Sequence, residues 1–156
     1  MPGSGASTTP LETAPLASVF AYGSLSFPEV WTLVAGRRHR VEPATLAGYR
    51  RARVRSAPYP GILPAHGGRV AGVVWHGVAC TALRRLDEFE GDLYRRVRLR
   101  VDVGGSACDA FAYVVEPSHA HRLAAEPWSE ETFRTRDLGA YLEGCLRFAR
   151  AWDARA

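Results

Sequence analysis

Apolar and polar positions alternate in short blocks along the first half of the chain, and glycine and proline separate the blocks. The apolar run at residues 19–22 stops at Gly23, which predicts a buried first strand that ends in a tight turn. Residues 28–35 begin with proline and end before a glycine, which is typical of a short helix. Residues 46–55 predict a second strand. Residues 56–68 contain three prolines and three glycines, so we expect a loop there.

Longer periodic segments fill the second half. Residues 69–78 are largely apolar and predict a buried strand. Residues 81–90 place apolar side chains at helical spacing and stop at a glycine. Residues 95–103 alternate between apolar and charged side chains, and two glycines then lead into residues 107–115, which predicts a hairpin. A final helix follows Ser129, which can cap it.

These elements predict an α+β fold with a small mixed sheet. About five to six strands would curl or close into a barrel, with the helices packed outside. A length of 156 residues suits one domain. We expect residues 1–17, rich in Gly, Ser, Thr and Pro, to form a flexible lead-in, and residues 18–156 to form the domain.

The composition narrows the possible chemistry. The chain contains no Lys, Asn or Gln, so every one of its 20 basic residues is arginine. This usage is typical of a GC-rich genome, a bacterial actinomycete being one candidate, and it excludes lysine nucleophiles and Cys-His-Asn triads. Three widely spaced cysteines and the absence of clustered His and Cys argue against a zinc site or a disulfide framework. A reducing cytoplasm fits best. We find no secretory signal at the N-terminus and no apolar run long enough to span a membrane.

Two segments contain candidate functional residues. In FAYGSLS, residues 20–26, a strand runs into a Gly-Ser turn whose backbone amides can bind an anion. In LDEFEGDLYRR, residues 86–96, Asp87 and Glu90 lie on one face of a helix near its end, and Glu88 lies on another. Taken separately, each pattern is also common as a structural turn or a solvated acidic face.

Together, the segments resemble the gamma-glutamylcyclotransferase family, most closely its plant avirulence-induced-gene-like branch and bacterial relatives. AYGSL at 21–25 is similar to the family's substrate loop. LAGYRR at 46–51 and YPGIL at 59–63 are similar to its second strand and cavity rim. VAGVVWHGV at 70–78, followed by LDEFEGDLYRR, resembles the strand and glutamate helix. PWSEETFRTRDLGAYL at 127–142 resembles the tryptophan-led C-terminal helix of the branch.

The resemblance implies an enzyme that releases 5-oxoproline and a free amine or amino acid from a gamma-glutamyl substrate. The substrate's own alpha-amine attacks the gamma-carbonyl, so no cofactor or metal is required. Glu90 would be the general acid/base, the amides of Gly23, Ser24 and Leu25 the anion cradle, the Tyr22 ring a wall and Tyr94 a hydroxyl near Glu90. Partial burial and the charge of Asp87 would raise the pKa of Glu90 toward that of an alpha-amine.

Other readings remain open at this point. A non-catalytic family member that binds small molecules or acts as an interaction module is the main alternative. A serine hydrolase is disfavoured because Gly-x-Ser-x-Gly is absent. Nucleic-acid binding is disfavoured because no aromatic ladder or nucleic-acid motif accompanies the arginines. The sequence does not determine which amine leaves or what the oligomeric state is. We expect the segment 56–68 to decide which amine leaves. The geometric requirement for an enzyme is that Glu90 and the amides of residues 23–25 face one cavity.

Overall fold

Five strands close into a barrel in this computed structural model, which describes residues 15–155. Around the barrel, the strand order is β1-β3-β2-β4-β5, and all neighbours are antiparallel except β1 and β5, which are parallel. The bounds are β1 Ala17–Ala21, β2 Arg40–Arg53, β3 Pro60–Val78, β4 Tyr94–Val103 and β5 Ser106–Val115. The predicted lead-in, residues 1–17, lies outside the described residues except for its last three.

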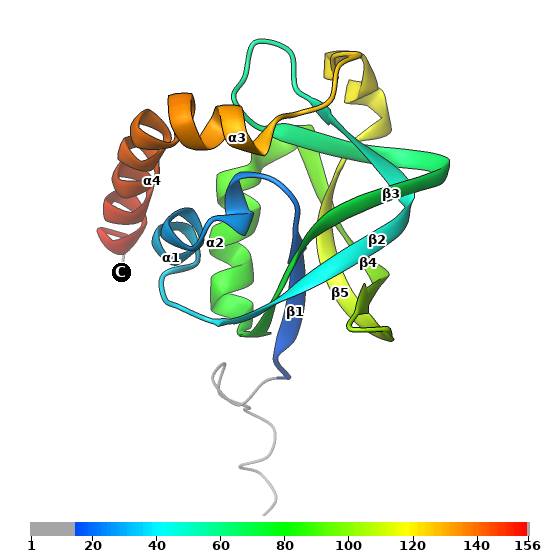
Figure 1. Ribbon diagram of the computed structural model, residues 1–156. Coiled ribbons are helices and arrows are strands. Elements are labelled where there is room, and N and C mark those ends of the chain that lie inside the picture. The colour runs from blue at the N-terminus through cyan, green and yellow to red at the C-terminus, as the bar shows by residue number, and fades with distance from the viewer. Residues whose placement is uncertain (1–14, 156) are drawn as a thin grey trace, which may run out of the picture.

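Four α-helices of the described residues pack outside the barrel, and Figure 1 shows α1, α2 and α4 gathered on one side of it. Their bounds are α1 Pro28–Ala35, α2 Cys80–Glu90, α3 Glu130–Thr132 and α4 Leu138–Asp153. A π-helical turn, Phe133–Asp137, joins α3 to α4. The predicted fold class, a closed mixed sheet with helices outside, is confirmed.

The apolar side chains form two cores because successive residues of a strand point to opposite faces. Phe20 of β1 points into the barrel, where it packs with Leu46, Val74 and other buried residues. Its neighbour Val19 faces the helices, in a second core that contains Trp31 of α1. The Trp31 and Trp75 rings stack there at 4.8 Å between centroids, which joins α1 to β3. The second core therefore fixes the helices against the sheet.

The expectation of a loop over residues 56–68 is wrong beyond residue 59. β3 begins at Pro60, opposite Arg53, so β2 and β3 form one long hairpin. A proline at the first residue of a strand breaks no essential ladder bond. The pairing then jumps from Tyr49 opposite Pro64 to Ala47 opposite Arg69, and residues 65–68 form a bulge. The prolines and glycines therefore mark a strand start and a bulge in this hairpin.

Candidate active site

The turn after β1 presents backbone amides at one end of the barrel. Gly23, Ser24 and Leu25 are buried, and Ser24–Ser26 form one turn of 3₁₀ helix in which the Ser26 amide donates to the Gly23 carbonyl at 2.9 Å. Within residues 15–155, the amides of Gly23, Ser24 and Leu25 donate to no protein acceptor. Buried amides without a partner are rare in proteins. These amides can therefore serve a bound anion or a developing oxyanion.

Two side chains fix the carbonyls of this turn. The Arg51 guanidinium donates to the Tyr22 carbonyl at 2.7 Å, and the Trp75 indole donates to the Leu25 carbonyl at 3.0 Å. Since both carbonyls are anchored from β2 and β3, the peptide planes between them have little freedom to rotate. The direction in which the amides point is thereby set by the barrel.

Gly23 is required for space. A Cβ atom there would lie 2.6 Å from two carbons of the Pro60 ring, closer than real Cβ contacts. Its φ of −136° lies outside the left-handed region, so the glycine is not required there for a positive φ. Close approach of the β2–β3 hairpin is what excludes a side chain.

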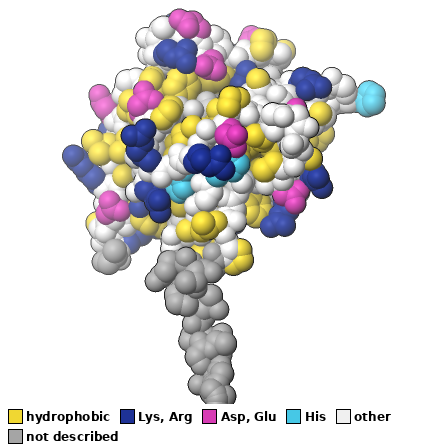
Figure 2. Space-filling model, turned by 60° about the horizontal axis from the view of Figure 1, so that its bottom comes forward, with side chains coloured by type: hydrophobic (Ala, Val, Ile, Leu, Met, Phe, Trp, Pro, Cys, Tyr) yellow, Lys and Arg dark blue, Asp and Glu magenta, His cyan; other side chains and the backbone are white. Residues whose placement is uncertain are grey.

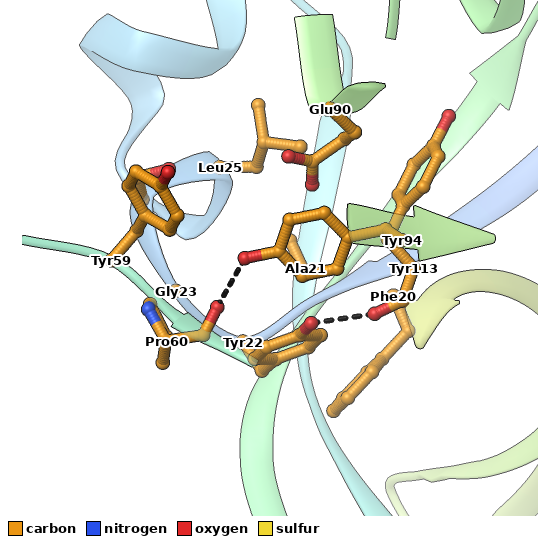
Figure 3. A pocket seen from close by; sticks show the side chains of 11 residues that line it. Phe20, Ala21, Tyr22, Gly23, Leu25, Tyr59, Pro60, Glu90, Tyr94 and Tyr113 are labelled. Atoms are coloured by element: carbon orange, nitrogen blue, oxygen red, sulfur yellow. Dashed lines mark hydrogen bonds between the residues drawn. The ribbon is translucent and has the colours of Figure 1, made fainter. Parts of the chain in front are cut away.

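Glu90 reaches the same pocket from the opposite side. It is the last residue of α2, which ends where Gly91 takes a φ of +72°. Its carboxyl points into the space between the turn after β1 and a group of tyrosines (Figure 3). The pocket is lined by Phe20, Ala21, Tyr22, Gly23, Ser24, Leu25, Tyr59, Pro60, Glu90, Tyr94 and Tyr113. The geometric requirement stated from the sequence is met.

The surroundings of Glu90 favour its protonated form. Burial, the larger cause, and the nearby charge of Asp87 together raise the pKa of Glu90 from 4.5 to about 8. The residue keeps partial exposure, while its carboxyl is enclosed by protein atoms and loses hydration. Both causes are the ones expected from the sequence. The resulting pKa is close to that of a free alpha-amino group, about 8.

Asp87 is held beside Glu90 by two partners. Its Oδ1 accepts a hydrogen bond from the Tyr113 hydroxyl at 2.7 Å, and Arg96 donates from Nε at 2.9 Å and from Nη2 to Oδ2 at 3.2 Å. These bonds fix the position of the Asp87 side chain, whose negative charge acts on Glu90. Glu88 instead faces outward and pairs with Arg155 at 3.2 Å.

The hydroxyls of Tyr22 and Tyr94 are both engaged with backbone. Tyr94 donates to the Pro60 carbonyl at 2.6 Å, and Tyr22 donates to the Tyr113 carbonyl (Figure 3). Burial raises the pKa of Tyr22 and Tyr94 well above 10, so both stay protonated. The two side chains line the pocket as predicted, but their protons are committed to these carbonyls. The expectation that Tyr94 offers its hydroxyl near Glu90 remains an untested proposal.

Sequence reasoning missed several residues of the pocket. Tyr59 and Pro60, from the β2–β3 hairpin, and Tyr113, from β5, complete its walls. Tyr141 of α4 lies behind the turn, with its hydroxyl 2.9 Å from Ser24 Oγ. No local motif marks Tyr113 or Tyr141, because each is a single residue in a segment distant in sequence from the turn and from Glu90. The YPGIL segment at 59–63, identified through the resemblance as a cavity rim, was the only available signal for Tyr59 and Pro60.

The pocket is narrow. Its free volume is about 20 Å³, which holds about one water molecule. A larger ligand can enter only if a wall moves. Tyr59 is the wall best placed to move, since it is partly exposed and lies just before β3.

His76 and several surface arginines have hydrogen-bond or ion-pair partners that account for them structurally. His76 lies 3.2 Å from Ser18 Oγ through Nδ1 and 2.7 Å from Glu42 through Nε2. On the face shown in Figure 2, the basic side chains of the described residues are interspersed with acidic and apolar ones. Among the described residues, several arginines are paired with carboxylates, as in Arg40 with Glu42.

Across residues 15–155, no three His, Cys, Asp or Glu side chains are grouped to hold a metal ion. None of the helices described is long and apolar enough to cross a membrane.

Comparison with known proteins gives close relatives in plants. AIG2-like protein A of Arabidopsis thaliana is 38% identical over 86 residues, which are 55% of this chain and 52% of that protein. The chain thus spans about half the length of this curated relative and of a second one from the same plant. These plant relatives give no support to the bacterial origin suggested by the composition.

Solved structures share the fold. The solution structure of an Arabidopsis thaliana protein matches with a TM-score of 0.67 at 29% identity, over 94% of this chain and 88% of that one. A structure described as a gamma-glutamyl cyclotransferase matches with a TM-score of 0.61 at 19% identity, over 84% and 86% of the two chains. At that identity, the second match shows the fold alone.

The family model described as gamma-glutamyl cyclotransferase, AIG2-like, matches residues 19–130. This match extends from β1 to the start of α3 and includes both the turn after β1 and Glu90. The chain belongs to the gamma-glutamyl cyclotransferase, AIG2-like family.

Proposed function

We propose that this protein is a gamma-glutamylcyclotransferase. It converts a gamma-glutamyl amide into 5-oxoproline and a free amine or amino acid. The observation that carries the proposal is the shared pocket, in which a proton-accepting carboxyl with a raised pKa faces unpartnered backbone amides. Family membership is consistent with this chemistry.

The nucleophile comes from the substrate. Its alpha-amine attacks its own gamma-carbonyl carbon, a C–N bond closes the five-membered ring, and the C–N bond to the leaving amine breaks. The enzyme must hold the extended glutamyl chain in a folded, near-attack conformation, which is an entropic contribution. Once a wall such as Tyr59 has moved to admit the substrate, the walls from β1, β3, α2, β4 and β5 enclose it closely, which suits this task.

Glu90 manages the proton. In its ionised form it accepts a proton from the substrate ammonium, and it can then deliver that proton to the leaving nitrogen. Transfer between groups of matched pKa is efficient, and Glu90 at about 8 matches an alpha-amine at about 8. An unperturbed glutamate, near 4.3, would be a poor base for this ammonium.

The amides of Gly23, Ser24 and Leu25 supply positive potential. We place either the substrate alpha-carboxylate or the oxyanion of the tetrahedral intermediate against them. The lining residues of the pocket include no Arg, Lys or His, so these amides are the main electropositive groups among them. The reaction needs no cofactor.

We assign the protein to the cytoplasm, since Cys80, Cys108 and Cys145 are unpaired, as in a reducing compartment.

The decisive experiment separates cyclisation from hydrolysis. The purified protein is incubated with gamma-glutamyl amides in heavy-oxygen water, and the products are analysed by mass spectrometry. Cyclisation gives unlabelled 5-oxoproline, whereas hydrolysis gives glutamate labelled in its carboxylate. Labelled glutamate as the primary product would refute the cyclotransferase assignment.

An N-acetylated gamma-glutamyl substrate provides the matched control. Its nitrogen is an amide and a very poor nucleophile, so a cyclotransferase leaves it intact. A hydrolase would still release N-acetylglutamate. Binding of 5-oxoproline without any turnover would instead favour a non-catalytic binding module.

A further inference from the structure

A second hollow lies beside the pocket, between the end of α2, the start of α4 and the β2–β3 connection. It is a groove of about 410 Å³, much larger than the pocket itself. Its lining includes Pro58, Phe89, Ala140, Tyr141 and Gly144, together with the carboxylate of Asp137. The surface is therefore largely apolar and aromatic.

The groove and the pocket are lined by different residues, but these residues adjoin one another in the chain and in space. Phe89 of the groove precedes Glu90 of the pocket, and Pro58 lies two residues before Pro60. Tyr141 joins the two spaces most directly. Its hydroxyl lies 2.9 Å from Ser24 Oγ, and its ring meets the Tyr59 ring at 6.4 Å between centroids. A ligand that extends beyond the pocket past Tyr59 therefore meets the groove.

The leaving nitrogen must lie close to Glu90. A group that returns a proton to that nitrogen has to be within hydrogen-bond reach of it. The glutamyl group itself already requires a wall of the pocket to move, so the pocket has no further room for a substituent on the leaving nitrogen. The groove begins at the residue next to Glu90 and offers about 410 Å³.

We propose that this groove binds the leaving group, and that the preferred substrates are gamma-glutamyl amides of amines with an apolar, aromatic-sized body. The inference rests on the proposed function. Phe89 and the Tyr141 ring, which meet edge to face at 6.2 Å, form a surface suited to an aromatic ring. Asp137 is the single charged group among the groove's described lining residues, and its carboxylate disfavours an anionic leaving group.

Two substrates that differ only in the leaving group test the inference. They are gamma-glutamyl methylamide and gamma-glutamyl phenethylamide. A hydrophobic pocket discriminates about tenfold or more for each well-packed apolar increment. We expect kcat/KM for the phenethylamide to exceed that for the methylamide by about tenfold or more.

A pair of matched variants tests whether the preference for the phenethylamide arises from the groove. Gly144→Leu fills the groove, and α4 accommodates it because a Cβ at Gly144 would meet only the Arg147 side chain, at 3.7 Å. Gly139→Leu is the control, since this glycine is exposed on the same helix and a Cβ there meets nothing within 4 Å. The substrate ratio should fall to near one in Gly144→Leu and stay at the wild-type value in Gly139→Leu.

The outcomes separate the two proposals. Turnover of both substrates to 5-oxoproline with equal kcat/KM overturns the groove assignment and leaves the cyclotransferase intact. A preference that survives Gly144→Leu also overturns the groove assignment. Formation of 5-oxoproline from neither substrate refutes the proposed function. Calorimetry then tests the groove assignment. It is supported if the wild type binds the phenethylamide more tightly than the methylamide and Gly144→Leu removes this difference. Equal binding of the two compounds by the wild type refutes it.

Discussion

Replacing Glu90 with glutamine removes one ionisable group from the pocket at nearly constant shape. In the unfolded chain this carboxyl loses its proton near pH 4.5, whereas in the folded protein it keeps the proton up to about pH 8. Between these two pH values, the unfolded state binds fewer protons, so the free energy of unfolding of the wild type falls as pH rises. Below pH 4.5 the carboxyl is protonated in both states, so its burial no longer carries the free-energy penalty of enclosing a group that would otherwise be ionised. Glutamine has no such penalty at any pH.

The size of the effect follows from the shift. A pKa raised from 4.5 to about 8 corresponds to an upper limit of about 5 kcal/mol at 1.36 kcal/mol per pKa unit. The partial exposure of the residue lowers this figure, so we expect about 2–3 kcal/mol. Glu90→Gln should therefore match the wild type in stability near pH 4.5 and exceed it progressively up to about pH 9.

Urea unfolding of both proteins across this pH range measures the difference. A stability difference that does not change with pH would refute the raised pKa and, with it, the proton-transfer role. The same substitution should lower the catalytic activity, although it raises the free energy of unfolding. Loss of a general base is worth about 10²–10⁴ in rate, so Glu90→Gln should lose most of its 5-oxoproline formation. Glu88→Gln is the matched control, because its carboxylate pairs outward with Arg155 and should affect neither property.

Three further predictions concern the neighbours of Glu90. Gly23→Val pushes a side chain into the Pro60 ring, so calorimetry should detect no binding of 5-oxoproline, and normal affinity would show that the turn is not the site. Tyr94→Phe loses the buried hydrogen bond to the Pro60 carbonyl, which should lower the free energy of unfolding by about 1–2 kcal/mol. A loss of kcat above tenfold with unchanged KM would give Tyr94 a direct role in the reaction. Asp87→Asn removes a charge that raises the pKa of Glu90, so the acidic limb of the kcat/KM profile should move to lower pH; an unmoved limb would contradict the coupling.

The elements with strong local signals were predictable from the sequence. α1 matches its prediction at residues 28–35, where Pro28 and Gly36 mark the two ends. The β4–β5 hairpin matches because its alternation and its Gly104–Gly105 turn are both local. The start of β2 was missed, since Arg40 and Val41 are exposed there and Glu42 is only partly buried, as in a loop. The start of β3 was missed because prolines weaken the strand pattern, although the long pairing with β2 outweighs them.

The site was predictable only where it is contiguous in sequence. The end of β1 and the turn after it contain six pocket residues in a row, from Phe20 to Leu25, and Glu90 lies at the end of α2 within the LDEFEGDLYRR motif, so motifs reveal them. Tyr113 and Tyr141 enter through β5 and α4, and single tyrosines in amphipathic segments carry no functional signal. The raised pKa of Glu90 was predictable in direction from the expected partial burial and from Asp87, but the extent of the burial, the larger cause, is a property of the closed barrel.

The parallel seam of the barrel has a consequence for dynamics. β1 meets β5 through the pairs Val19 with Phe111 and Phe20 with Ala112, a much shorter register than that between β2 and β3. Together with the single pair between β2 and β4, this short seam is one of two places where the sheet can open locally, and the turn that carries Gly23 follows it directly. Amide hydrogen exchange at Val19 and Phe20 should therefore be faster than within the β2–β3 hairpin. Ligand binding at the turn should slow that exchange, so the seam would act as a solution reporter of pocket occupancy.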